Sequence, residues 1–117
     1  MLSLRLRSNA LGEIIAINAR GHMGTADYGK DLACVAASVL LQNTAFILSE
    51  TGCLSGLEIT PGALKLRLKR NLSFSQEVPS KILMQSLLEG LENLRKSYPG
   101  NLKFKFEGRR QRLWQKK

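Results

Sequence analysis

Three short segments of this chain alternate between apolar and mostly charged residues, and this pattern constrains the fold more than any other feature. They read "LSLRLR" at 2–7, "LKLRLK" at 64–69 and "LKFKFE" at 102–107. Because successive side chains of a β-strand point to opposite faces, each segment predicts a strand with one apolar face and one polar face. The sheet that they build must therefore be covered on one side and open to solvent on the other.

Two further strands are predicted from their composition and from the turns beside them. The segment "EIIAINAR" at 13–20 is rich in β-branched residues and follows the turn signal "SNALG", so it should form a hairpin with the first strand. The segment "GLEIT" at 56–60 is followed by the turn "PGA" and then by the alternating segment at 64–69. This arrangement predicts a second hairpin.

Helical periodicity predicts two helices. The first runs over about 31–49, with Asp31 as its N-cap and Gly52 as its terminator. Nearly every side of this helix is apolar, which predicts that most of it is buried. The second helix runs over about 81–97, after a loop at 73–80, and is stopped by "YPGN".

These elements follow one another in the order ββαββαβ. Strands with a single apolar face favour an α+β fold, a two-layer sandwich in which both helices cover one face of a mostly antiparallel sheet. The chain has 117 residues, which fits a single domain. We expect that domain to span 1–108, followed by a basic C-terminal tail at 109–117 that holds five Lys and Arg residues.

The cysteines and the N-terminus indicate the cellular compartment of the protein and whether it could hold a metal ion. Cys34 and Cys53 lie at or beyond opposite ends of the first helix, on the order of 25 Å apart, which is too far for a disulfide. One histidine and two cysteines fall short of a closed zinc site, and no metal or cofactor is expected. The N-terminus lacks the apolar block of a signal peptide, and the longest apolar run is too polar for a membrane span. We therefore expect a cytoplasmic protein with free thiols.

The formal net charge is +9, and the alternating strands concentrate that charge on the open face of the sheet. The outward positions hold Lys, Arg and Ser and no aromatic residue, so bases cannot stack there as they do on RNA-recognition modules. Two interpretations stay open: a solvated face that keeps the domain soluble, and a face that makes non-specific contact with RNA or the ribosome through phosphates alone. The cations expected on this face are Arg5, Arg7, Lys65, Arg67, Lys69, Lys103 and Lys105.

The candidate chemical group is the pair formed by His22 and Cys34. Cys34 would lie in the first helical turn, where free N–H groups and the helix dipole favour a thiolate. It shares a polar stripe with Asp31, Ser38 and Gln42, and the glycine-bearing loop is long enough to bring His22 back over the helix start. The alternative is that Cys34 is inert packing, as cysteines on apolar helices usually are. Cys53 has no histidine near it in sequence and is interpreted as structural.

The stretch "GHMGTADYGKDLACVAAS" resembles the signature of the ribosomal-processing cysteine protease family, Prp. That family's pattern is roughly G-H-A, a short glycine-containing loop, and then G-x-D-I-V-C-A-A-V-S. The spacing from the histidine to the cysteine agrees, as do the chain length and the order of elements. Departures exchange one apolar residue for another, and Met23 beside the histidine is the largest of them. The residues that match the pattern are Gly21, His22, Gly29, Asp31, Cys34, Ala36 and Ser38.

The resemblance implies a cysteine endopeptidase that removes the N-terminal extension of large-subunit ribosomal protein twenty-seven. It implies Cys34 as the nucleophile and His22 as the general base and later acid. Asp31 and Ser38 would support the site, although Asp31 serves equally well as a helix cap.

The resemblance also implies an apolar substrate segment, and Gly24 and Gly29 would be hinges of a lid over it. It further implies a homodimer, and no membrane partner is expected. The alternative function is a non-catalytic ribosome- or RNA-binding module that uses the cationic sheet face.

Overall fold

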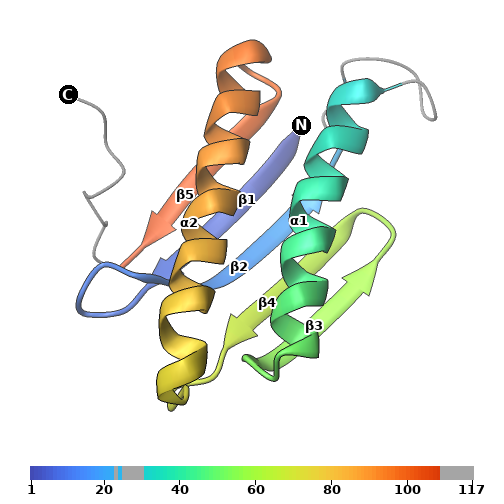
Figure 1. Ribbon diagram of the computed structural model, residues 1–117. Helices are drawn as coiled ribbons and strands as arrows, with labels where there is room; N and C mark the ends of the chain where they lie inside the picture. The colour runs from blue at the N-terminus through green and yellow to red at the C-terminus, as the bar shows by residue number, and fades with distance from the viewer. Residues whose placement is uncertain (23, 25–30, 109–117) are drawn as a thin grey trace.

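The computed structural model describes residues 1–22, 24 and 31–108, and the predicted basic tail at 109–117 lies outside them. The order ββαββαβ is confirmed (Figure 1). The elements are β1 (Leu2–Ser8), β2 (Ile14–Gly21), α1 (Leu32–Glu50), β3 (Leu54–Thr60), β4 (Ala63–Leu68), α2 (Phe74–Ser97) and β5 (Leu102–Glu107).

The five strands form one sheet in the order β3-β4-β2-β1-β5. Both predicted hairpins are present, and β2 pairs with β4 to join them into an antiparallel unit. Only β5 departs from this, because it returns after α2 and pairs in parallel with β1. The expectation of a mostly antiparallel sheet is therefore confirmed, and the strand order is added by the structure.

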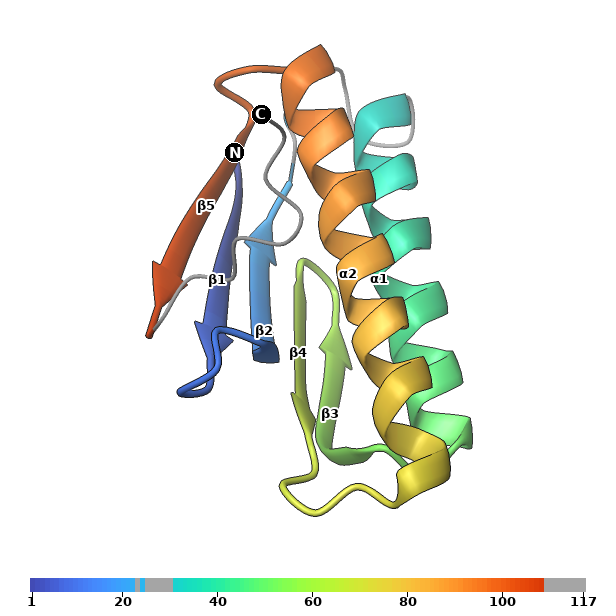
Figure 2. The same ribbon diagram turned by 60° about the vertical axis from the view of Figure 1, so that its left-hand side comes forward.

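Both helices cover the same face of the sheet, while the opposite face is open (Figure 2). The alternation predicted from the sequence decides which side chains meet the helices: Leu4 and Leu6 of β1 are fully buried, and Leu64 and Leu66 of β4 are buried too. Half of the six buried residues of α1 are alanines, and their small side chains let the helix approach the sheet closely. The resulting core lies between the two layers.

The prediction that α1 is largely buried is wrong. Six of its 19 residues are buried, and its outer face carries exposed apolar side chains. In a two-layer fold the sheet covers only one side of a helix, so an apolar outer side stays open unless a further layer covers it. By length and composition α1 could also cross a membrane, but core helices of soluble proteins meet the same test. The exposed residues are Leu32, Val35, Val39, Phe46 and Ile47.

The predicted loop at 73–80 is also wrong, because α2 already begins at Phe74. The side chain of Gln76 accepts a hydrogen bond from the N–H of Ser73 at 2.9 Å, which is one half of a capping box. Pro79 is the sixth residue of α2, and because it has no N–H, the helical hydrogen bond to the carbonyl of Ser75 is missing near the start of the helix. The Ser-x-x-Gln spacing was the sequence signal for this start.

Candidate active site

Cys34 lies in the first turn of α1, and the residue before the helix holds it there. The side chain of Asp31 accepts a hydrogen bond from the N–H of Cys34 at 2.9 Å, so the predicted N-cap is confirmed. Asp31 is 6% exposed, whereas Cys34 is only partly buried. The thiol is therefore accessible at the end of the helix whose dipole favours negative charge.

His22 directly follows β2, and two close contacts of Gly21 fix the position of the end of that strand. Gly21 has φ of 101°, and a Cβ atom there would lie 2.3 Å from the backbone oxygen of Met1, so only glycine fits. The N–H of Gly21 donates to the oxygen of Gly62, in the turn between β3 and β4, at 2.9 Å. These contacts direct the side chain of His22 toward the N-terminal end of α1.

The sulfur of Cys34 lies 3.8 Å from Nδ1 of His22. This is within the range of a sulfur hydrogen bond, and catalytic hydrogen bonds are often longer before substrate binds. The other side of the imidazole faces Gly62, where a Cβ atom would lie 3.4 Å from Nε2. The ring is therefore placed between the helix start and the β3–β4 turn.

A small pocket of about 90 Å³ opens beside the pair, between α1 and the sheet. Three members of the predicted polar stripe, Cys34, Ser38 and Gln42, line it together with His22. The fourth member, Asp31, is instead engaged in capping. Apolar residues complete the wall, among them Leu2, Ala19, Leu41, Ile59 and Leu64. The pocket can hold a side chain but not a whole peptide.

The other predicted positions have different outcomes. Gly24 is exposed with φ of 70°, while Gly29 and Met23 lie outside the described residues. Cys53 is 2% exposed, and its sulfur lies 3.3 Å from Oγ1 of Thr51, a buried position that suits a structural role. Both cysteines are free thiols.

Sequence reasoning missed the contribution of Gly62 and of the Met1 backbone. The Pro-Gly pair at 61–62 signalled a turn, but nothing in the sequence placed that turn against the imidazole.

The arrangement is suited to nucleophilic chemistry. It combines a thiol, an imidazole within reach of the sulfur, and a helix N-terminus that stabilises developing negative charge. Within residues 1–22, 24 and 31–108, no three His, Cys, Asp or Glu side chains converge into a group that could hold a metal ion.

Comparison with known proteins also points to chemistry by a cysteine nucleophile. A sequence model of the family described as "Cysteine protease Prp" matches residues 1–103. No curated protein matches the chain significantly.

Among solved structures, the chain resembles the ribosomal processing protease Prp of S. aureus with a covalently linked product peptide. The identity is 17% and the TM-score 0.78, covering 92% of this chain and 100% of the other. The same protease with a substrate peptide gives 16% identity and a TM-score of 0.73, with the same coverage of both chains. The protein SMU.848 of Streptococcus mutans gives 22% identity and a TM-score of 0.73, covering 93% and 96%.

Proposed function

The chain belongs to the cysteine protease Prp family, and we propose that it removes the N-terminal extension from the precursor of large-subunit ribosomal protein twenty-seven. In this proposal Cys34 is the nucleophile and His22 the general base. The observation that supports it most directly is the distance of 3.8 Å between the Cys34 sulfur and Nδ1 of His22, at the N-terminus of α1. Membership in a protease family speaks against the alternative of a non-catalytic module.

The reaction would proceed by acyl transfer through the thiol. His22 takes the proton of the Cys34 thiol, and the sulfur attacks the scissile carbonyl to form a tetrahedral oxyanion. When the intermediate collapses, His22 gives the proton to the leaving amine and a thioester remains. Water, deprotonated by His22, then attacks the thioester, which releases the new carboxylate and restores the thiol.

The capping contact narrows the choice of oxyanion donors. The first turn of α1 has several N–H groups without helical partners, but that of Cys34 already donates to Asp31. The N–H groups of Leu32 and Ala33 are therefore the candidates in this turn. In this assignment Asp31 positions Cys34 by capping the helix, and Ser38 lies at the pocket rim without touching the reacting atoms.

The S. aureus protease with a similar fold has been solved with substrate and product peptides, which supports a peptide substrate for this chain as well. We propose that an apolar side chain of the precursor enters the pocket beside Cys34, whose wall includes Leu2, Leu41 and Leu64. The segment that contains Gly24 and Gly29 would close over it as a lid.

Two further parts of the proposal concern the setting of the enzyme. Free thiols at Cys34 and Cys53 suit a reducing compartment, and we place the enzyme in the cytoplasm. We also propose a homodimer in which the exposed apolar outer face of α1 packs against a second copy. Val35 and Val39 are 55% and 51% exposed, so covering them would remove apolar area from water.

The proposal is tested with a peptide that spans the junction between extension and mature protein, cut by purified enzyme and analysed by mass spectrometry. Wild type should cut at a single bond, and Cys34→Ala should abolish the cut. His22→Ala should lower kcat/KM by about 10²–10⁴ or more, because general acid–base catalysis alone contributes that much. Cys53→Ala is the matched control and should stay within about twofold, since Cys53 lies in the core.

Two results would contradict different parts of the proposal. Residual cutting by Cys34→Ala at the wild-type bond would show that another group is the nucleophile. Failure of the wild-type enzyme to cut the junction, while its Cys34 is alkylated selectively, would show that the substrate is wrong.

A further inference from the structure

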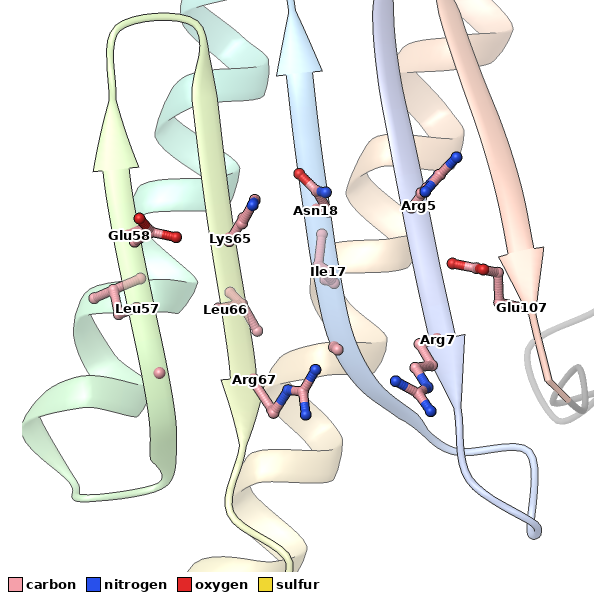
Figure 3. A pocket seen from close by; sticks show the side chains of 12 residues that line it. Arg5, Arg7, Ile17, Asn18, Leu57, Glu58, Lys65, Leu66, Arg67 and Glu107 are labelled. Atoms are coloured by element: carbon pink, nitrogen blue, oxygen red, sulfur yellow. The ribbon is translucent and has the colours of Figure 1, made fainter.

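Besides Arg20 of β2, which stands beside Ser3 and Ala63 near one end of the sheet, the open face carries six cations that the proposed protease function does not use. They stand on three strands, and all are exposed on the side opposite the helices; Figure 3 shows four of them around one groove. Lys69, predicted on the same face, follows the end of β4. We call this set the cationic face: Arg5 and Arg7 of β1, Lys65 and Arg67 of β4, and Lys103 and Lys105 of β5.

The strand register arranges these cations in rows across the sheet. In one row Lys105, Arg5, Asn18 and Lys65 are successive neighbours on β5, β1, β2 and β4. In the next row, Arg7 and Arg67 flank Ala16. Neighbouring strands lie about 4.8 Å apart, and side chains two residues apart on one strand about 6.7 Å apart. The face is therefore a lattice of positive charges at fixed intervals.

These charges have few counter-charges. None of the six forms a salt bridge with another described residue, whereas Lys81 and Arg95, on α2, both do. Two carboxylates share the face: Glu58 pairs in register with Lys65, and Glu107 with Arg7. Both lie on the outer strands β3 and β5, so the middle of the face remains positive.

A groove of about 560 Å³ runs between the cations. Its floor is low because Ala16 and Gly56 occupy the positions beside Arg67. The Oδ1 atom of Asn18, also in the lining, is buried and has no hydrogen-bond partner among the described residues. Buried polar atoms are rarely left without partners. The groove thus combines cations on its walls with an unused acceptor in its floor.

We propose that the cationic face binds the sugar–phosphate backbone of an RNA strand without regard to base sequence. Phosphates match the cations in charge, and contacts to phosphates and sugars carry no base-sequence information. Phe104 and Phe106 point into the core with Leu4 and Leu6, so no aromatic side chain of β5 offers a base a stacking surface.

Other anionic partners fit this face less well. None of the exposed large apolar side chains stands on the open face of the five strands. A lipid surface is bound firmly only when apolar side chains enter it, and the core of a protein interface is apolar and poor in lysine. A nucleic-acid backbone needs neither, since released counterions supply the free energy of binding.

The active-site pocket lies on the helix side of the sheet, so RNA and a peptide can be bound together. This inference does not rest on the proposed cleavage reaction. An RNA-bound enzyme would be held near newly made ribosomal proteins, and the local concentration of precursor would rise.

The test measures fluorescence anisotropy of a labelled 20-nucleotide poly(U) RNA against the full chain, from 50 to 300 mM KCl. Each phosphate neutralised on a single strand contributes about 0.7 to the slope of log K against log salt, so engagement of the six cations predicts a slope near −4. The variant Arg5→Gln/Arg67→Gln should reduce the slope by about 1.4 and weaken binding about 25-fold at 0.1 M salt. Thermal denaturation should be unchanged, because both positions are exposed.

The matched control is Lys96→Glu, which lowers the net charge by the same two units at an exposed position on α2. It should weaken RNA binding less than threefold. Arg5→Lys/Arg67→Lys, which keeps the charge, should bind within about threefold of wild type.

Equal losses in Lys96→Glu and the double glutamine variant would overturn the proposal, because binding would then follow net charge and not this face. A 20-residue poly-glutamate that binds as tightly as the RNA, or vesicles with 30% phosphatidylserine that do so, would assign the face to an acidic protein or a membrane. Absence of RNA binding at 50 mM KCl would also overturn it.

Discussion

The two cysteines of this chain lie at opposite ends of α1, and their surroundings differ in every respect. At the N-terminal end Cys34 is partly exposed, and its sulfur faces an imidazole at 3.8 Å. Just past the C-terminal end Cys53 is buried, and its sulfur faces the hydroxyl of Thr51 at 3.3 Å. The side chain of Asp31 caps the first end. At the second end the N–H groups of Gly52 and Cys53 donate to Ser49 and Leu48, and the hydroxyl of Thr51 donates to the carbonyl of Ile47.

The difference shows that position on the helix decides what a thiol can do. The N-terminal end of a helix stabilises negative charge that develops on a nearby group and the C-terminal end opposes it, so Cys34 lies at the end suited to an attacking sulfur and Cys53 does not. Burial adds to the contrast, because a charged sulfur loses its hydration in the core. The same residue type therefore packs at one end of α1 and is available for chemistry at the other.

The largest expected effect is on thiol reactivity. If the two sulfurs reacted alike, the difference described between Cys34 and Cys53 would be wrong. In single-thiol proteins, Cys53→Ala leaves only Cys34 and Cys34→Ala leaves only Cys53. We expect iodoacetamide at pH 7 to alkylate Cys34 about 10³-fold faster or more, because Cys53 must wait for an opening that costs several kcal/mol. Mass spectrometry of timed samples gives both rates.

Denaturant supplies the control for this measurement. In 6 M guanidinium chloride both thiols are exposed, and their rates should converge to within a few-fold. If Cys53 already reacted within tenfold of Cys34 in the native protein, the assignment of Cys53 to the core would be wrong.

A smaller effect is expected when the cap at either end of α1 is removed, because only the N-terminal cap also holds the proposed nucleophile. Asp31→Ala removes a side-chain cap and should lower the free energy of unfolding by about 1 kcal/mol. Gly52→Ala forces a side chain onto a residue with φ of 72° and should cost about the same. Only Asp31→Ala should also lower kcat/KM for the precursor peptide, since Asp31 holds the backbone of Cys34.

Urea denaturation and cleavage assays on the same preparations separate these effects. Asp31→Asn keeps a capping acceptor and should retain most of the stability. A loss of activity in Gly52→Ala equal to that in Asp31→Ala would mean that general destabilisation, and not the placement of Cys34, is being measured.

Much of the fold could be predicted because local patterns carry it. Alternation placed Leu4, Leu6, Leu64 and Leu66 in the core, and the turn signals gave both hairpins. The strand order could not be obtained, because the pairing of β5 with β1 depends on contacts between residues about a hundred positions apart. The early start of α2 could have been predicted locally, from the Ser-x-x-Gln spacing at its N-cap.

In the candidate site, too, some features could be predicted from local sequence and others could not. Asp31 and Cys34 could be placed from helix-capping rules alone, and the family resemblance supplied His22 as a partner. The supports of His22 could not be predicted, because Gly62 and the Met1 backbone reach the imidazole and Gly21 only through the folded sheet. The catalytic roles themselves stay predictions.

The smallest expected effect concerns an ion pair between the β1–β2 turn and α2. This ion pair sets the pH range in which the two cysteines of α1 can be compared. Nζ of Lys81 lies 2.9 Å from Oε2 of Glu13. The hydrogen bond from Lys81 holds the pKa of Glu13 below its ordinary value, against burial, which raises it; Asn9 and the charge of Lys81 lower it further. A lowered pKa in the folded state contributes stability above the unfolded pKa, and this stability is lost as pH falls through the folded value.

Glu13→Gln should therefore be slightly less stable than wild type at pH 7, and this gap in stability should close between about pH 5 and pH 3. Thermal melts of both proteins across that range measure the gap; a gap that stayed constant would show that packing of Glu13, and not its charge, is responsible. Since the stability of the fold itself changes in this acidic range, the reactivities of Cys34 and Cys53 are to be compared above it.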